Sequence, residues 1–352
     1  MGIWYATRED VKGALDFKET ARSNGQIDRA IEAASRSVEA LCHRRFYPEL
    51  ATRYFDWPNG QHAHTWRLWL DANELISLTT LTADGTTIAD TDYFLEPNQY
   101  GPPYNRLEID LASSAAFGGG DTHQRNIAIT GLYGYRNDET SVGITAEVLD
   151  ASETGVDVDG PTSAQVGVGS VLRIDTERMF VTGRSMLDTG QNLGGSGVTA
   201  QVNSVTVAVS DGTQFAIDET ILIESERMLI VDIAGNNLTV KRAWDGTVLA
   251  AHSAGVDIYA PRTLAVTRAA LGTTAAAHSS GATISRWDPP GPVRTLVMGQ
   301  AISTLTAELS AYSRVKRGGD SNVEKARDTS ALGALREQVY QSHGRKARIR
   351  GV

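Results

Sequence analysis

Two phrases of this chain occur twice, and this repetition constrains the fold more than any other feature. Residues 171–183 read VLRIDTERMFVTG and residues 221–231 read ILIESERMLIV, so an acid, a hydroxyl residue and Glu-Arg-Met recur in one order. A second pair reads LTVKRAWDGTVLAAHSAGVDI at 238–258 and LAVTRAALGTTAAAHSSGATI at 264–284. Internal repeats indicate that one supersecondary unit is present more than once.

The two pairs have different offsets, and this difference orders the units along the chain. The offset from Met179 to Met228 is almost twice the offset from His252 to His278, so the chain does not hold two plain tandem copies. Both first halves of the repeat precede both second halves. We expect nesting, because chains avoid crossing connections. The alternative is two intertwined modules that exchange halves. The nested module then spans 198–260, and the split module spans 144–187 and 262–287.

The recurring residues could form a catalytic or ligand-binding set, or they could hold turns in place. We expect the structural role, because turn chemistry is commonly duplicated with its scaffold whereas catalytic residues rarely are. In this interpretation the acid and the arginine pair across a turn, the isoleucine and methionine point inward, and the histidine binds the backbone. The residues concerned are Glu177, Arg178, Met179, Glu226, Arg227, Met228, His252 and His278.

Helical periodicity is present at the start of the chain. Thr7 and Asp10 have the spacing of a capping box, which predicts a short helix that ends near Thr20. Apolar residues from Ile27 to Leu41 then recur at helical spacing and predict a second helix.

The remaining segments have other patterns. Residues 51–136 alternate polar and apolar side chains and predict strands. Apolar residues from Val293 to Tyr312 predict an amphipathic helix. Residues 316–352 are predicted to be a flexible arm with a basic end. The cations of this arm that we expect at a partner interface are Arg345, Lys346, Arg348 and Arg350.

Together these patterns predict an α+β fold. Its core would hold the N-terminal helices, the strands and the late helix, at 1–140 and 288–315. Into this core would be inserted an all-β region of two small, repeated barrel- or sandwich-like modules, the second nested in the first.

Composition excludes several classes of protein. The formal net charge of −9 argues against a dedicated nucleic-acid binder. No apolar run reaches the roughly 18–20 residues that span a bilayer, and the N-terminus lacks the pattern of a signal peptide. Cys42 is the only cysteine, so we expect a buried thiol in a reducing compartment.

The sequence offers no positive case for an enzyme, a cofactor or a metal. It has no Gly-rich phosphate loop, no G-x-S-x-G and no H-E-x-x-H. His62 and His64 could form a metal pair, but an exposed loop is the better interpretation. Residues 157–160 resemble part of a calcium loop, yet Val168 stands where the loop needs a glutamate.

Outside the repeats, the chain resembles the head-to-tail connector (adaptor) family of long-tailed bacteriophages. The order and spacing of four segments carry the resemblance, and the long insertion between Arg136 and Trp287 is the departure from it. The repeats also resemble modules of structural proteins from actinobacterial phages. The four segments are Leu41 to Pro48, Tyr93 to Tyr104 with Gly101-Pro102-Pro103-Tyr104, Ile129 to Tyr135, and the helix after Pro292.

The resemblance implies a virion structural protein without catalytic activity. Its members form a homo-oligomeric ring, here expected to be a dodecamer, that docks under the portal protein and extends the DNA channel. The ring also gives the next neck or tail-completion protein its attachment surface. The location would be the virion neck, after assembly in the host cytoplasm. Genomic DNA would pass through the channel without sequence-specific binding. Each Lys or Arg contact to a phosphate adds affinity, so an acidic chain suits a channel that must let DNA slide.

The basic arm and the repeats leave two further expectations. In the adaptor interpretation, the arm orders when it binds a neighbouring ring. The alternative function is a surface- or glycan-binding β-module protein of a phage tail or fibre. That alternative predicts exposed aromatic side chains in the repeats, where the sequence has few and duplicates none.

Overall fold

The computed structural model describes residues 2–15, 23–58, 64–316 and 330–345, and within them the chain is mostly β-sheet. Strands make up 35% of the structure and helices 25%. The helices are α1 (Arg8–Leu15), α2 (Asn24–Cys42), α3 (Gly160–Gln165), α4 (Gly291–Lys316) and α5 (Ser330–His343). The first seven strands are β1 (Glu49–Phe55), β2 (Arg67–Trp69), β3 (Leu75–Ala83), β4 (Thr86–Ile88), β5 (Tyr93–Glu96), β6 (Arg106–Ile109) and β7 (Ile127–Tyr133).

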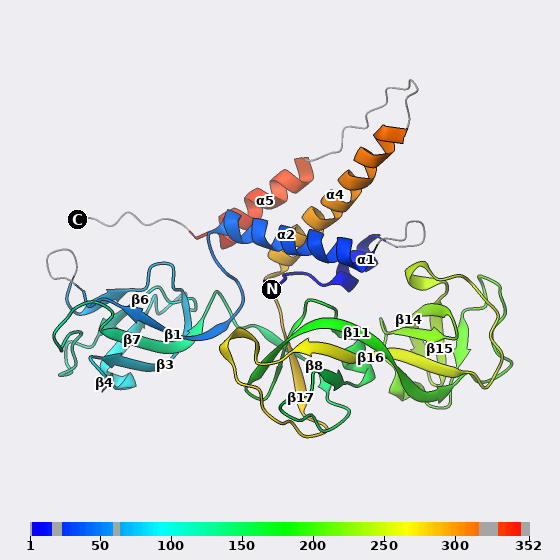
Figure 1. Ribbon diagram of the computed structural model, residues 1–352, viewed down its shortest axis with the longest axis horizontal. Coiled ribbons are helices and arrows are strands. Elements are labelled where there is room, and N and C mark those ends of the chain that lie inside the picture. The colour runs from blue at the N-terminus through cyan, green and yellow to red at the C-terminus, as the bar shows by residue number, and fades with distance from the viewer. Residues whose placement is uncertain (1, 16–22, 59–63, 317–329, 346–352) are drawn as a thin grey trace.

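The later strands lie between β7 and α4. They are β8 (Glu139–Ile144), β9 (Gly155–Asp157), β10 (Val171–Ile174), β11 (Glu177–Asn192), β12 (Thr206–Ala208), β13 (Thr220–Ile223), β14 (Glu226–Ala234), β15 (Asn237–Lys241), β16 (Asp257–Thr267) and β17 (Thr283–Trp287). Figure 1 shows three β bodies in a row, with α1, α2, α4 and α5 on one side of them.

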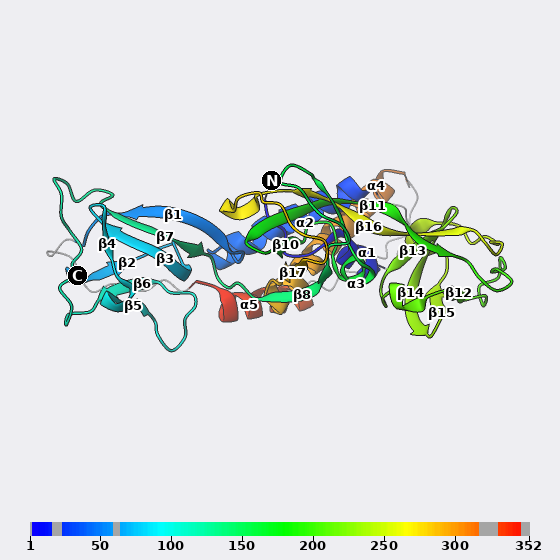
Figure 2. The same ribbon diagram turned by 90° about the horizontal axis from the view of Figure 1, so that it is seen from below.

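The predicted α+β class, a connector core of helices and strands with an inserted all-β region of two small barrel- or sandwich-like modules, is wrong, because the chain is mostly β-sheet and one large sheet runs through the repeat region. The largest element is a ten-stranded antiparallel sheet in the order β12-β15-β14-β13-β16-β11-β10-β17-β8, with β9 paired to β16. The Gly- and Thr-rich sequence suggested short strands, but β11 and β16 run on through both modules (Figure 2). Register shifts along this pair bend the strands without ending them.

Two separate apolar cores lie along this sheet. One contains buried residues from 193–258, and we call this part the nested module. The other combines residues from 142–181 with residues from 264–284, and we call it the split module. Met179 and Met228 are fully buried in their respective cores, as predicted.

A third β body, the small β unit, spans residues 49–133. Its four-stranded sheet has the order β1-β7-β3-β4, and its three-stranded sheet has the order β2-β6-β5. Side chains of β7 alternate between buried and half-buried, which confirms the strand periodicity of this region. The unit has its own core, including Leu75, Leu81, Leu107 and Ile129.

The N-terminal helices follow the predicted pattern. The Thr7 N–H donates to Asp10 Oδ2 at 2.9 Å and the Asp10 N–H donates to Thr7 Oγ1 at 3.1 Å, which confirms the capping box. The predicted end of this helix near Thr20 lies outside the described residues. In α2, Ile27 and the apolar residues one and two turns later are buried. The helix ends where His43 adopts a φ of 52°.

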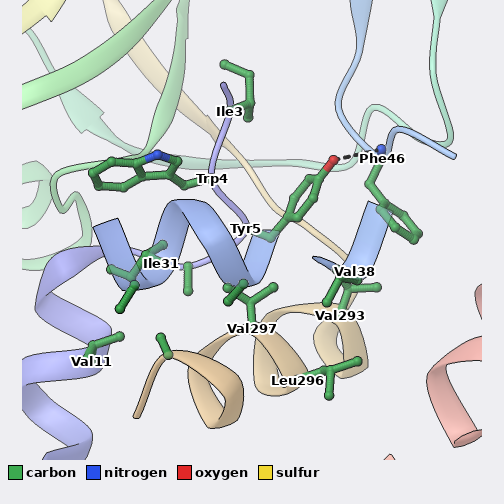
Figure 3. Close-up of a cluster of buried hydrophobic side chains, with 14 of the residues drawn as sticks. Ile3, Trp4, Tyr5, Val11, Ile31, Val38, Phe46, Val293, Leu296 and Val297 are labelled. Atoms are coloured by element: carbon green, nitrogen blue, oxygen red, sulfur yellow. Dashed lines mark hydrogen bonds between the residues drawn. The ribbon is translucent and has the colours of Figure 1, made fainter. Parts of the chain in front are cut away.

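Tyr5 joins the helices to β17, the last strand of the repeat region. Its hydroxyl donates to Glu39 Oε1 at 2.6 Å and accepts from the Phe46 N–H at 3.2 Å, the bond drawn in Figure 3. Its ring lies 6.0 Å from that of Trp287, the last residue of β17. Burial, and then the nearby Glu39 carboxylate, raise the pKa of Tyr5 well above its usual value.

The C-terminal part of the chain differs from the expected arm. Ser330–His343 form α5, whose Leu332 and Leu335 pack against the core shared with α2 and α4. Arg345 is held at its backbone, where its N–H donates to the Cys42 carbonyl at 2.8 Å. Lys346, Arg348 and Arg350 lie outside the described residues, as do the side chains of Leu309 and Tyr312. None of the described helices is long and apolar enough to cross a membrane.

Candidate functional site

The repeated residues form two matching buried clusters, and the first surrounds Glu226 in the nested module. Its side chain is 0% exposed and accepts five hydrogen bonds. Arg242 donates through Nε at 2.8 Å and Nη2 at 2.7 Å, and His252 Nε2 lies at 3.0 Å. The backbone N–H groups of Ala243 and Ala250 donate at 2.8 and 3.0 Å.

The split module repeats this arrangement around Glu177, which is also 0% exposed. Arg268 donates through Nε and Nη2, each at 2.8 Å, and His278 Nε2 lies at 3.0 Å. The N–H groups of Ala269 and Ala276 donate at 2.9 Å each. The duplicated sequence therefore encodes a duplicated hydrogen-bond network.

The second nitrogen of each histidine binds a carboxylate at a tight turn. His252 Nδ1 lies 2.6 Å from Glu224, and His278 Nδ1 lies 2.8 Å from Asp175. Glu224 and Asp175 are the first residues of the two-residue turns before β14 and β11, with φ of 52° and 51°. The prediction that the histidine ring binds the backbone is wrong, because each ring joins two acids of one turn.

The arginines of the Glu-Arg-Met phrase do not pair with an acid of that phrase across the turn, so that prediction is also wrong. Arg178 donates to Asn137 and Glu139, and Arg227 donates to Asp245. Successive residues of a strand point to opposite faces of the sheet, so the side chains of adjacent Glu and Arg lie apart. The cation for each buried glutamate comes instead from the second repeated phrase, which keeps an arginine at a fixed position before its histidine.

The remaining donors of Arg242 and Arg268 hold an adjoining loop. In each cluster Nη1 donates to two carbonyl oxygens, and Nη2 also donates to the carbonyl of Ala250 or Ala276. The loop carbonyls are those of Thr199 and Ser204 in the nested module, and those of Asp150 and Glu153 in the split module.

The electrostatics of both clusters favour structure over reactivity. Burial alone would raise the pKa of Glu177 and Glu226, but the hydrogen bonds from arginine, two N–H groups and histidine outweigh it and lower each pKa to about 2. Both carboxylates are therefore ionised at neutral pH. Their oxygens are occupied and shielded from solvent, so a substrate could reach them only if the turn opened.

The residues of the weaker metal patterns take part in local packing and capping. Asp159 caps α3 by accepting from the Thr162 N–H, and Asp157 accepts from the Thr263 hydroxyl. His64 stacks on Trp66, while His62 lies outside the described residues. Among the residues that the structure describes, no group of three or more His, Cys, Asp or Glu side chains is placed to hold a metal ion.

A cavity of about 630 Å³ lies between the end of α2 and the small β unit. It collects charged side chains from α2, the segment after α2, β1 and the segment just before β3. Sequence reasoning missed this site, because its walls come from segments that the chain places together only through the packing of α2 over the small β unit.

Comparisons with protein-family models, curated proteins and solved structures find no match to this chain.

We predict that Glu226→Gln destabilises the nested module by about 3–5 kcal/mol, because it leaves the buried Arg242 guanidinium without a counter-charge. Hydrogen exchange followed by mass spectrometry should show lost protection in residues 220–258 and unchanged protection in the helices. Glu224→Gln is the matched control, since that side chain is 55% exposed. Unchanged protection in Glu226→Gln would contradict the role of the cluster.

Stability should also fall with acid in a defined window. A native pKa of about 2 against an ordinary value of 4.5 means that the unfolded chain binds these protons first. The stabilisation is therefore complete above about pH 4.5 and is lost as the pH falls toward 2. Thermal unfolding measured from pH 6 down to pH 3 should show a smaller loss of stability in the Glu177→Gln, Glu226→Gln double variant than in the unchanged chain. Equal losses in the two proteins would exclude these carboxylates as the source of the acid sensitivity.

Proposed function

We propose that this chain is a head-to-tail adaptor of a long-tailed bacteriophage. In this proposal, copies form a dodecameric ring that docks under the portal, extends the DNA channel and offers the tail side an attachment surface. The segments that resemble the family belong to the helices and the small β unit. Two of them meet directly, since the ring centres of Phe46 and Tyr135 lie 5.5 Å apart.

The observation that carries the proposal is that the two ends of the repeat region lie side by side. The Asp288 N–H donates to the Asp138 carbonyl at 2.9 Å, and Trp287 Nε1 donates to the Arg136 carbonyl at 3.1 Å. A segment whose ends are adjacent can be added to a fold without changing its path. This geometry supports treating residues 137–287 as an insertion into an adaptor chain.

Charge is consistent with a conduit for DNA. The chain has a net charge of −9, and phosphate contacts by Lys and Arg are what hold DNA to a protein. A ring of such chains would repel the duplex and let it slide. Its place would be the virion neck, after assembly in the host cytoplasm.

The glycan-binding alternative has less support. Sugar sites need exposed aromatic faces, but in the repeat region Phe180, Phe215 and Trp287 are each buried. Trp244 and Tyr259 are half-buried. We therefore assign the modules a packing or decorating role on the ring.

The test is complementation in the phage that encodes the chain. A stop codon in the gene should leave heads and tails unjoined, and the full chain supplied from a plasmid should restore joined particles. A variant without the nested module should also restore them, because that module lies at one end of the molecule (Figure 1). In this variant an Asn-Gly turn joins Asp188 to Tyr259, which are paired across β11 and β16.

Joined, infectious particles from the stop-codon phage would contradict the adaptor role. Failure of the shortened variant alone would contradict only the assignment of the nested module to decoration.

A further inference from the structure

The cavity beside α2 has the character of a binding site for an anion. Its lining includes four arginines, Arg36, Arg44, Arg45 and Arg53. Against these stand three glutamates, so the lining carries a positive excess in a chain whose net charge is −9. Such a local reversal of charge is typical of a site that attracts an acidic partner.

The three acids of the cavity fix most of these arginines in place. Arg44 Nη2 lies 3.1 Å from Glu74, and Arg53 Nη2 lies 2.9 Å from Glu49. The Arg53 guanidinium also lies 4.1 Å from the centre of the Tyr133 ring. Guanidinium groups held in this way can bind a ligand with little loss of conformational entropy.

Some donors of the cavity remain unused. Arg45 has one long contact, 3.8 Å to Glu49, and its side chain is 62% exposed. The other arginines of the cavity are already paired with its glutamates, including Arg36 Nη1 at 2.9 Å from Glu39. Arg45 is therefore the cation of the cavity that is most available to a ligand.

Further cations surround this site. The Arg345 N–H is bound to the end of α2, and Arg345 together with Arg44 offsets part of the rise that burial causes in the pKa of Glu74. Burial, followed by the charges of Arg44 and Arg136, lowers the pKa of His343 at the end of α5. The positive region therefore extends from the cavity across the ends of α2 and α5.

We propose that this cavity receives an acidic segment of a partner protein, with a carboxylate bound by Arg45 and Arg44. A volume of about 630 Å³ admits one or a few side chains. A cavity of this volume admits individual side chains but not a rigid duplex, so it favours an acidic peptide segment over double-stranded DNA. The inference is independent of the adaptor role, since any acidic partner would satisfy it.

The test uses the full chain and a fluorescent deca-glutamate peptide, with binding measured by anisotropy at low and moderate salt. We expect salt-sensitive binding that weakens by about tenfold in Arg45→Glu, because one charge-assisted contact is reversed. Arg45 is exposed, so this variant should fold normally. Arg125→Glu is the control, since Arg125 precedes β7 at the end far from the cavity.

Two results would overturn the proposal. One is absence of peptide binding, or binding that Arg45→Glu leaves unchanged. The other is a duplex oligonucleotide that binds more tightly than the peptide and loses affinity in Arg45→Glu, which would assign the cavity to nucleic acid.

Discussion

The buried glutamate, bound at once by an arginine, a histidine and two backbone N–H groups, is the interaction on which the repeat region depends. The same five contacts form in both modules, although the glutamate and its arginine are 16 positions apart in the nested module and 91 apart in the split module. In the split module the glutamate opens β11 and its arginine follows β16, so the cluster fixes one end of the two long strands. Each carboxylate is stabilised only when both halves of its module are present, and this ties the halves of the split module together across the inserted one.

The rest of the molecule is arranged around that joined pair of modules. Phe180 of β11 packs edge-to-face on Trp4, with ring centres 5.9 Å apart, so the split module completes the core of the helices. The nested module reaches the helices through an ion pair of 2.8 Å between Lys12 and Asp245. Asp245 lies in a turn of the repeated phrase, and the corresponding turn of the split module packs Leu271 against the helical core. Both copies of the turn therefore face the helices, one through charge and the other through apolar contact.

Sequence patterns predicted those features that depend on residues close together in the chain. The capping box at Thr7, the buried face of α2 and the inward methionines follow from local spacing. The partner of each buried glutamate does not, because alternation along a strand turns the adjacent arginine away and the true partner lies on another strand. The continuity of β11 was hidden by bulges, which carry the same glycines and polar residues as turns. The cavity beside α2 depends on how two separately folded parts meet, and no local pattern encodes that.

The adaptor role that we propose would link these parts: a body of helices and strands, an insertion that starts and ends at one point, and a cavity with a positive excess on an acidic chain. The most direct measurement is the mass of the purified protein by native mass spectrometry, alone and after mixing with the portal of the same phage. The account predicts a defined multimeric ring, or a monomer that assembles into a ring on the portal. A protein that stays monomeric and never binds the portal would contradict it.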